Sequence, residues 1–176
     1  MATKTLPVTG IELPSDEWEM RNYKQNLAFS EETLCFTATI VHLPTKTKME
    51  VSNEGHGGSD FIMWDQRQPK VQEAEAAWKQ FVADCTPAMQ ASVANDPNEW
   101  VRGIYDNGAS EESVIGLFTN ELSNQKMLSG KRGLVIRKNP TDDEFTVYRA
   151  GTTPEQLAGR VAGEYWDKKT KNWVAL

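Results

Sequence analysis

The chain has 176 residues, of which 39% are hydrophobic and six are tryptophan, and this is enough for one ordinary core but not for two. Its net charge of -6 argues against non-specific binding to nucleic acid, which depends on clustered Lys and Arg. No segment approaches the roughly 18 apolar residues of a membrane helix, and the N-terminus has no charged start followed by an apolar run. We therefore expect a cytoplasmic single domain over residues 1–176 with no membrane partner, led by about ten mobile residues.

The pattern of residues 33–43, TLCFTATIVHL, predicts a half-buried strand, because apolar and polar side chains alternate along it. The run KMEVSN at 48–53 returns in register after a short connection, so the two predict an antiparallel hairpin. His42 falls on the apolar face, where we expect a buried, hydrogen-bonded histidine. The segment 18–27 is expected to add an edge strand, and DFIMWD at 60–65 either a third strand or an anchor.

Helical spacing begins after Pro69 and predicts an amphipathic helix that Pro87 ends. Residues 95–110 are rich in Asn, Asp, Gly and Pro and predict a loop. We expect its apolar residues to dock on the core, namely Trp100, Ile104 and Tyr105. Ser110 is expected to cap a second helix. The buried face of that helix is predicted to consist of Val114, Leu117, Phe118 and Leu122.

Two further runs, GLVIRK at 133–138 and EFTVYRA at 144–150, flank the turn residues 139–143 and predict a second hairpin. A capping box at Thr153 predicts a third helix that continues through Tyr165. The tail is expected to form a last strand or a docked extension. The whole chain is thus predicted to be α+β, with antiparallel hairpins interleaved with about three helices. The strand order, and whether the hairpins share a sheet, stay open.

The loop VSNEGHGGSD at 51–60 is the first candidate site. Glycine permits positive φ and close approach, so Gly55, Gly57 and Gly58 could turn amide groups toward an anion. The polar side chains that could assist them are Asn53, Glu54, His56 and Ser59. The alternative is a wide turn that needs glycine only for its backbone shape. A dinucleotide fingerprint is excluded, because Asp60 stands where a third glycine is required.

Catalytic and metal chemistry find little support in the sequence. His56 is flanked by glycines and its imidazole could donate or accept a hydrogen bond, but Ser59 and Asp60 are too close along one loop to be assumed to form a triad with it. The spacing of His42 and His56 matches no metal motif. We therefore expect no metal and no cofactor, and an enzyme that uses His56 as acid or base is the least favoured alternative.

The second candidate site is a basic cluster in an otherwise acidic protein. It could meet a phosphate, a nucleotide or an acidic protein face, and the alternative is a solvated helix end. A Walker loop is rejected because Gln125 and Arg132 occupy positions that need Gly and Ser or Thr. The cluster consists of Lys126, Lys131, Arg132, Arg137 and Lys138.

The strand FTATI followed by VSN-x-G-x-G-G resembles a group of small uncharacterised proteins encoded by phages and bacterial mobile elements. The resemblance covers Tyr23 to Gly58 and extends more loosely to KRGLVIRK. It carries no activity or catalytic residue. It implies a small protein that acts in the bacterial host cytoplasm by binding a host system.

These observations together predict a non-catalytic binding protein, a phage-encoded inhibitor or sponge with a counter-defence role. Its partner is expected to be a host protein. The alternative is a nucleotide or another phosphorylated small molecule held by the loop with Lys131 or Arg132. The oligomeric state stays open. The predicted binding residues are Asn53, Glu54, Gly55, His56, Gly57, Gly58, Ser59, Lys131 and Arg132.

Overall fold

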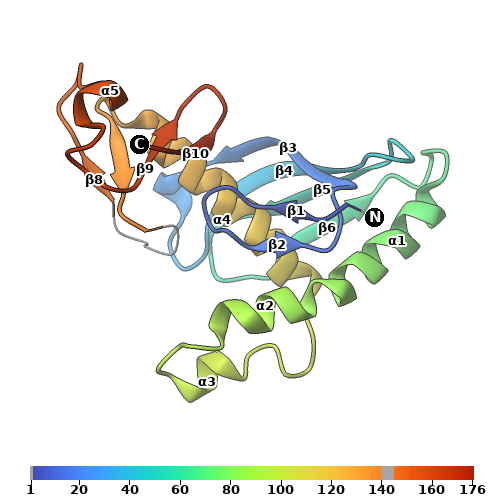
Figure 1. Ribbon diagram of the computed structural model, residues 1–176. Helices are drawn as coiled ribbons and strands as arrows, with labels where there is room; N and C mark the ends of the chain where they lie inside the picture. The colour runs from blue at the N-terminus through green and yellow to red at the C-terminus, as the bar shows by residue number, and fades with distance from the viewer. Residues whose placement is uncertain (1, 140–144) are drawn as a thin grey trace. The chain divides into compact units, whose positions relative to one another are not determined.

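The computed structural model describes residues 2–139 and 145–176, which divide into two compact units. The first unit contains Glu12–Thr119 and the chain start up to Lys4, and the second contains Thr5–Ile11 and Asn120–Leu176. The boundary falls within the long helix α4, Glu111–Gly130 (Figure 1). The two four-stranded sheets are antiparallel, which confirms the predicted α+β class. That residues 1–176 form a single domain stays a prediction.

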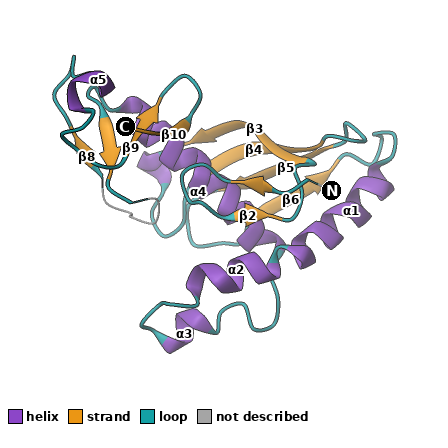
Figure 2. Cartoon of the chain, viewed as in Figure 1, coloured by secondary structure: helices purple, strands orange, loops and turns teal. Residues whose placement is uncertain are grey.

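The sheet of the first unit has the strand order β3-β4-β5-β6 (Figure 2). Its strands are β3 (Trp18–Gln25), β4 (Phe36–His42), β5 (Lys48–Asn53) and β6 (Phe61–Trp64). In the centre, Ile40 lies opposite Met20 on one side and Met49 on the other. The predicted hairpin and edge strand are confirmed, and DFIMWD supplies a strand at the second edge.

Aromatic side chains fill the core of the first unit. Trp18 of β3 lies with its ring centroid 4.9 Å from that of Trp78, which is fully buried on helix α1 (Val71–Asp84). Phe81 of the same helix stacks on Phe118 of α4 with a centroid separation of 6.4 Å. Rings of this size remove large apolar areas from water and are the main stabilising element of the unit.

His42 is buried as expected, stacked on Trp18 at 4.4 Å, with Nδ1 2.9 Å from the Thr45 hydroxyl. Burial lowers its pKa below the ordinary 6.5, and the nearby carboxylates Glu17 and Glu73 raise it by less. As the pH falls, His42 is therefore protonated at a higher pH in the unfolded chain than in the folded chain. The stability that neutral His42 contributes is complete above pH 6.5 and is lost as the pH falls below it.

We predict that urea unfolding between pH 7.5 and 5.5 shows this loss in the wild type and a smaller loss in His42→Phe, which keeps the aromatic stack. The measured quantity is the difference in unfolding free energy between the two proteins at each pH. A difference that does not change with pH would contradict the assignment.

The helix predictions hold in part. Helix α1 matches its predicted range, but Pro87 does not end the helical path, because α2 (Thr86–Val93) begins there with this proline in its first turn. Proline is tolerated at that position, where its missing N–H has no helical partner to lose. The predicted cap of α4 is confirmed, since the Ser110 hydroxyl accepts the Ser113 N–H at 3.1 Å. On its predicted face Val114 and Phe118 are buried, and Leu117 and Leu122 are half-buried.

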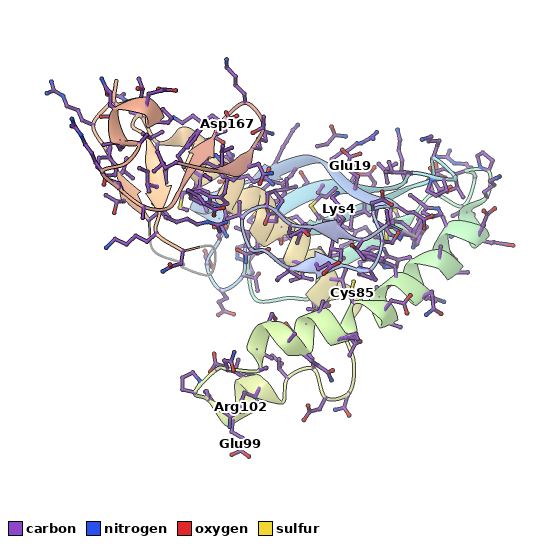
Figure 3. The ribbon with its side chains drawn as sticks, viewed as in Figure 1. Lys4, Glu19, Cys85, Glu99, Arg102 and Asp167 are labelled. Carbon is purple, nitrogen blue, oxygen red and sulfur yellow. The ribbon has the colours of Figure 1, made fainter. Side chains whose placement is uncertain are left out.

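The expected docking of the 95–110 loop on the core is wrong for two of its three apolar residues. Trp100 is 74% exposed and Ile104 48%, and Tyr105 is half-buried. Trp100 sits on the one-turn helix α3 (Glu99–Arg102), whose ends are labelled in Figure 3. The segment is tied to α2, because the Gln90 side chain donates to the Tyr105 carbonyl at 3.1 Å. A single turn fixed in this way cannot turn a whole apolar face inward.

The sheet of the second unit has the order β10-β9-β7-β8. Strand β7 (Val135–Arg137) pairs with β8 (Thr146–Val147), which confirms the second hairpin, while residues 140–144 of its turn lie outside the described residues. The two hairpins therefore belong to different sheets. Strands β9 (Glu164–Asp167) and β10 (Asn172–Ala175) complete the sheet, and the core contains Leu128, Val135 and Trp166.

The predicted third helix is wrong beyond its first turn. The capping interaction exists, since the Gln156 side chain accepts the Thr153 N–H at 3.0 Å, but helix α5 covers only Pro154–Leu157. Tyr165 instead lies in β9, paired with Ile136 of β7. Helix α5 ends because Ala158 leaves helical geometry at ψ 129° and Gly159 follows at φ +75°. Gly163 then precedes β9 at φ +135°, where a Cβ would collide with a backbone carbonyl of β7.

The chain start is more ordered than its sequence indicates. Strand β1 (Lys4–Thr5) pairs with β2 (Glu12–Leu13), and Leu6 is buried. The turn that comes next is held by Glu121 of α4, whose buried carboxylate accepts the N–H groups of Val8 and Thr9 at 2.9 and 3.0 Å. The anchor is thus a charged side chain more than a hundred residues away.

Candidate functional site

The loop 53–60 joins β5 to β6 and is organised by the buried side chain of Asn53. Its Oδ1 accepts the Gly55 N–H at 2.8 Å and the Thr33 hydroxyl at 2.7 Å. Its Nδ2 donates to the Gly58 carbonyl and to the Asp60 carboxylate, both at 2.9 Å. One amide side chain therefore ties the two ends of the loop together.

A second segment, residues 27–33, lies against this loop. It begins with the short 3-10 helix η1 (Leu27–Phe29), and the Gly55 carbonyl accepts the N–H groups of Glu31 and Glu32, both at 3.0 Å. Gly55 itself is at φ +89°, where a side chain would be strained and would strike the backbone of Phe29. This pairing is invisible in the sequence, because hydrogen bonds to a backbone carbonyl leave no residue pattern.

The N–H groups of two loop glycines donate hydrogen bonds to side chains of the protein itself. The Gly55 N–H donates to the Asn53 side chain and the Gly57 N–H to the Thr33 hydroxyl at 3.3 Å. Two of the amides expected to hold an anion therefore already have acceptors within the protein. This geometry favours the alternative to an anion site, a turn that requires glycine for its shape.

The charges around the loop are mainly negative. The His56 Nδ1 lies 3.2 Å from the Glu31 carboxylate, and both side chains are exposed. Glu32 approaches Gly57 and Glu54 is exposed. Burial raises the pKa of Asp60, and its hydrogen bond from Asn53 opposes that shift. Such surroundings repel a phosphate and attract a cation.

The loop nevertheless borders a hollow of about 540 Å³. Phe61, the first residue of β6, lines it and is 60% exposed. Four polar side chains among the predicted binding residues line the hollow along with Phe61 and Ser52, although the amide of Asn53 is already bonded within the loop. The four are Asn53, Glu54, His56 and Ser59, with Gly58 as a fifth backbone contributor.

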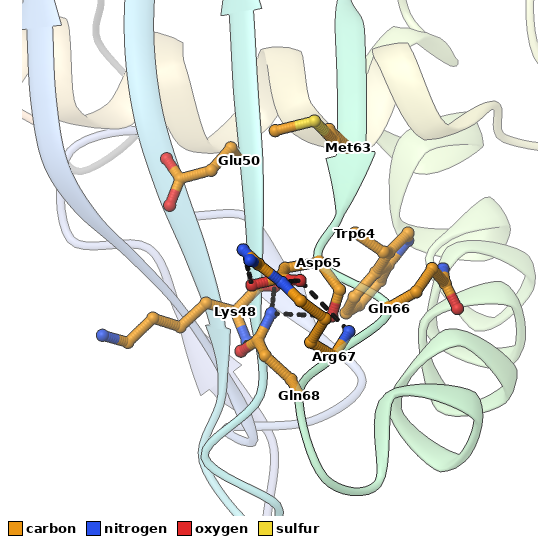
Figure 4. A pocket seen from close by; sticks show the side chains of 8 residues that line it. All are labelled: Lys48, Glu50, Met63, Trp64, Asp65, Gln66, Arg67 and Gln68. Atoms are coloured by element: carbon orange, nitrogen blue, oxygen red, sulfur yellow. Dashed lines mark hydrogen bonds and ion pairs between the residues drawn. The ribbon is translucent and has the colours of Figure 1, made fainter.

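A second hollow, of about 570 Å³, lies at the other end of β6 (Figure 4). The Gln68 side chain closes it on one side by accepting the Lys48 N–H and donating to the Lys48 carbonyl, both at 2.8 Å. The Arg67 guanidinium bonds the Asp65 carboxylate at 2.9 Å. Met63 lines this hollow and is 48% exposed.

Strand β6 therefore connects two hollows and carries an apolar side chain into each. Phe61 and Met63 are two residues apart, so they lie on the same side of the strand. The strand is the last of its sheet, and among the described residues its hydrogen-bonded neighbour is β5. The sequence predicted DFIMWD as a strand or an anchor, but all four residues of FIMW are apolar, so the sequence does not show which of them face outward.

Lys131 and Arg132 belong to the second unit, whereas the loop belongs to the first, so neither unit alone carries the predicted composite site. The Lys131 ammonium lies 5.9 Å from the centre of the Phe145 ring, and Lys168 donates to the Lys131 carbonyl. Arg137 leaves the basic cluster altogether, because it is 8% exposed and bonded to Glu164 at 2.8 Å. The exposed members of the cluster are Lys126, Arg132 and Lys138.

The described residues were expected to contain no metal site and no membrane-spanning helix, and one buried cysteine bears on thiol reactivity. Residues 2–139 and 145–176 contain no group of three or more His, Cys, Asp or Glu side chains arranged to hold a metal ion. Over the same ranges, no helix combines the length and apolar character needed to cross a bilayer. Burial raises the pKa of Cys85, which lies between α1 and α2 (Figure 3), to about 12, so its thiol stays protonated and unreactive near neutral pH.

Similarity to other proteins does not assign the chain to a class. No protein-family model matches it, and neither the curated proteins nor the solved structures contain a match. Its function must therefore be inferred from the residues and their geometry.

Proposed function

We propose that the chain is a non-catalytic binding protein whose first unit engages a partner protein along β6. One observation carries the proposal: Phe61 and Met63 are 60% and 48% exposed on one side of an edge strand and line two neighbouring hollows. Exposed apolar residues that are grouped, rather than scattered, mark interaction sites. Aromatic and Met side chains are enriched in such interfaces, and hollows beside them accept anchor residues of the partner. We name residues 53–64 the edge surface.

The charges around the loop define the chemistry of the partner. Glu31, Glu32 and Glu54 are exposed beside the 540 Å³ hollow. A partner that places an apolar side chain on Phe61 and a Lys or Arg over the loop complements both features. The resemblance to phage proteins supports a bacterial host protein as this partner, which makes an inhibitor or a sponge of a host system the proposed role.

The test compares two variants that each remove one exposed aromatic residue from the same unit. Phe61→Ser alters the edge surface, and Trp100→Ser, on α3, serves as the matched control. We expect immobilised wild type to retain a host protein from bacterial lysate, Phe61→Ser to weaken that interaction at least about tenfold, and Trp100→Ser to retain it. Affinities are then measured with the purified partner by calorimetry.

Both substitutions replace exposed side chains, so the melting temperature should change little, and circular dichroism confirms the fold. Because charge contributes, binding should weaken as salt rises from 0.1 to 0.5 M. Equal retention by wild type and Phe61→Ser, or loss in Trp100→Ser alone, would refute the edge surface. No retained protein, together with a melting temperature raised by a nucleotide, would instead support the phosphate-binding alternative.

A further inference from the structure

The second unit contains a separate cavity of about 250 Å³. Its wall is shared between apolar side chains and three polar groups, which are the amide of Asn124, the guanidinium of Arg137 and the indole of Trp173. All of the lining residues belong to this unit. The apolar ones are Val8, Met127, Leu128 and Phe145.

The indole N–H of Trp173 is fully buried and has no hydrogen-bond partner among the described residues. A buried donor without an acceptor costs free energy, and such groups are rare in folded proteins. Trp166, in the same core, shows the ordinary arrangement, since its indole N–H donates to the Ser129 hydroxyl at 3.3 Å. The unpartnered N–H of Trp173 therefore points to an acceptor supplied by a bound molecule.

Arg137 is placed to assist that acceptor. It is 8% exposed, and its guanidinium carbon lies 4.4 Å from the centre of the Trp173 ring. Its Nε and Nη2 both contact a single oxygen of Glu164, at 2.8 Å each, which holds the planar group in a fixed orientation beside the cavity. A further cation, Lys131, lies above the Phe145 ring.

The volume of the cavity limits the size of the molecule that it can bind. At about 30 Å³ for each water-sized group, 250 Å³ holds roughly eight such groups. A nucleotide is larger than this, and pockets for drug-sized ligands begin at about 300 Å³. The apolar wall suits a single ring or a short aliphatic chain.

We propose that this cavity binds a small carboxylate with an apolar body. The ring or chain occupies the apolar part of the wall, one carboxylate oxygen accepts the Trp173 N–H, and the Arg137 guanidinium stabilises the negative charge. This site is independent of the edge surface, and it would let the concentration of a small organic acid stabilise the second unit.

The experiment titrates phenylacetate and its neutral counterpart phenylacetamide into the full chain and follows ligand and protein signals by NMR. We expect phenylacetate to bind with a Kd below about 1 mM and phenylacetamide at least tenfold more weakly. Trp173→Phe replaces the indole by a smaller phenyl ring that lacks the N–H, and it should weaken phenylacetate binding about tenfold, with circular dichroism confirming the fold. Trp78→Phe, which removes the other buried and unpartnered indole N–H among the described residues, is the matched control.

Each outcome decides the proposal. Unchanged phenylacetate affinity in Trp173→Phe, or an equal loss in Trp78→Phe, would remove the role of the indole. Equal affinity for the acid and the amide would overturn the choice of a carboxylate. Absence of binding by both probes and by an aliphatic acid of similar size, hexanoate, would overturn the site. Should Trp78→Phe unfold, Trp166→Phe replaces it as the control.

Discussion

Replacing Gly55 by alanine is expected to lower the free energy of unfolding by about 3 kcal/mol. Gly55 has a φ of +89°, a conformation that costs an L-residue about 1–2 kcal/mol. The added Cβ would also collide with the Phe29 carbonyl and come within 2.9 Å of the Cys35 Cβ. Both neighbours belong to the main chain or lie next to it, so the loop and the segment 27–33 would have to separate.

Gly58 provides the matched control within the same loop. A Cβ at Gly58 meets no atom within 4 Å, and its φ lies outside the left-handed region. Gly58→Ala should therefore change stability by no more than about 0.5 kcal/mol. Urea unfolding of the two variants measures the contrast. Similar effects at the two positions would contradict the description of Gly55 as the contact point between the two segments.

Replacing Glu121 by alanine should also lower the free energy of unfolding by about 3 kcal/mol. This carboxylate is 2% exposed and accepts from the N–H groups of Val8 and Thr9, from the Thr9 hydroxyl and from the Gln125 side chain. Its removal leaves several half-buried donors without these acceptors, and a fully buried donor without an acceptor costs about 1–3 kcal/mol.

Two further variants separate the causes. Glu121→Gln keeps one oxygen acceptor but loses the charge, so its loss should be about half as large. Gln125→Ala removes only one of the donors and should cost less than about 1 kcal/mol. Hydrogen exchange at the amides of residues 8 and 9 reports the local effect. A Glu121→Ala protein with wild-type stability and unchanged exchange would show that the carboxylate does not anchor the chain start.

The strands were predictable because their signal is local. Alternation over FTATI and KMEV depends only on neighbouring residues, and β5 buries one face as that alternation requires, whereas β4 is buried on both faces from Ala38 to His42. The limits of the helices were harder to predict. Pro87 and Gly163 each change the chain path through an interaction that the sequence does not display, respectively a helix start and a close approach to the backbone of β7.

The candidate sites were likewise predictable from the sequence only in part. The glycine loop was identifiable from the sequence, and the hollow beside it includes four of its polar side chains. The occupation of the loop amides by Thr33 and Asn53 was not, because the contacts of Thr33 cross about twenty residues. Arg137 was predicted in a surface cluster, although pairing with Glu164 in β9 buries it. Charge along the sequence does not reveal such pairing, since the partner comes from a distant strand.

Contact between a partner protein and the edge surface should be visible in backbone hydrogen exchange, measured for the free chain and for its complex with the captured host protein. In the complex, we expect slower exchange over residues 53–64 because the partner excludes water from them, with little change over α3 (Glu99–Arg102). Slower exchange over α3, with residues 53–64 unaffected, would show that the partner binds elsewhere and that the edge surface is not its site.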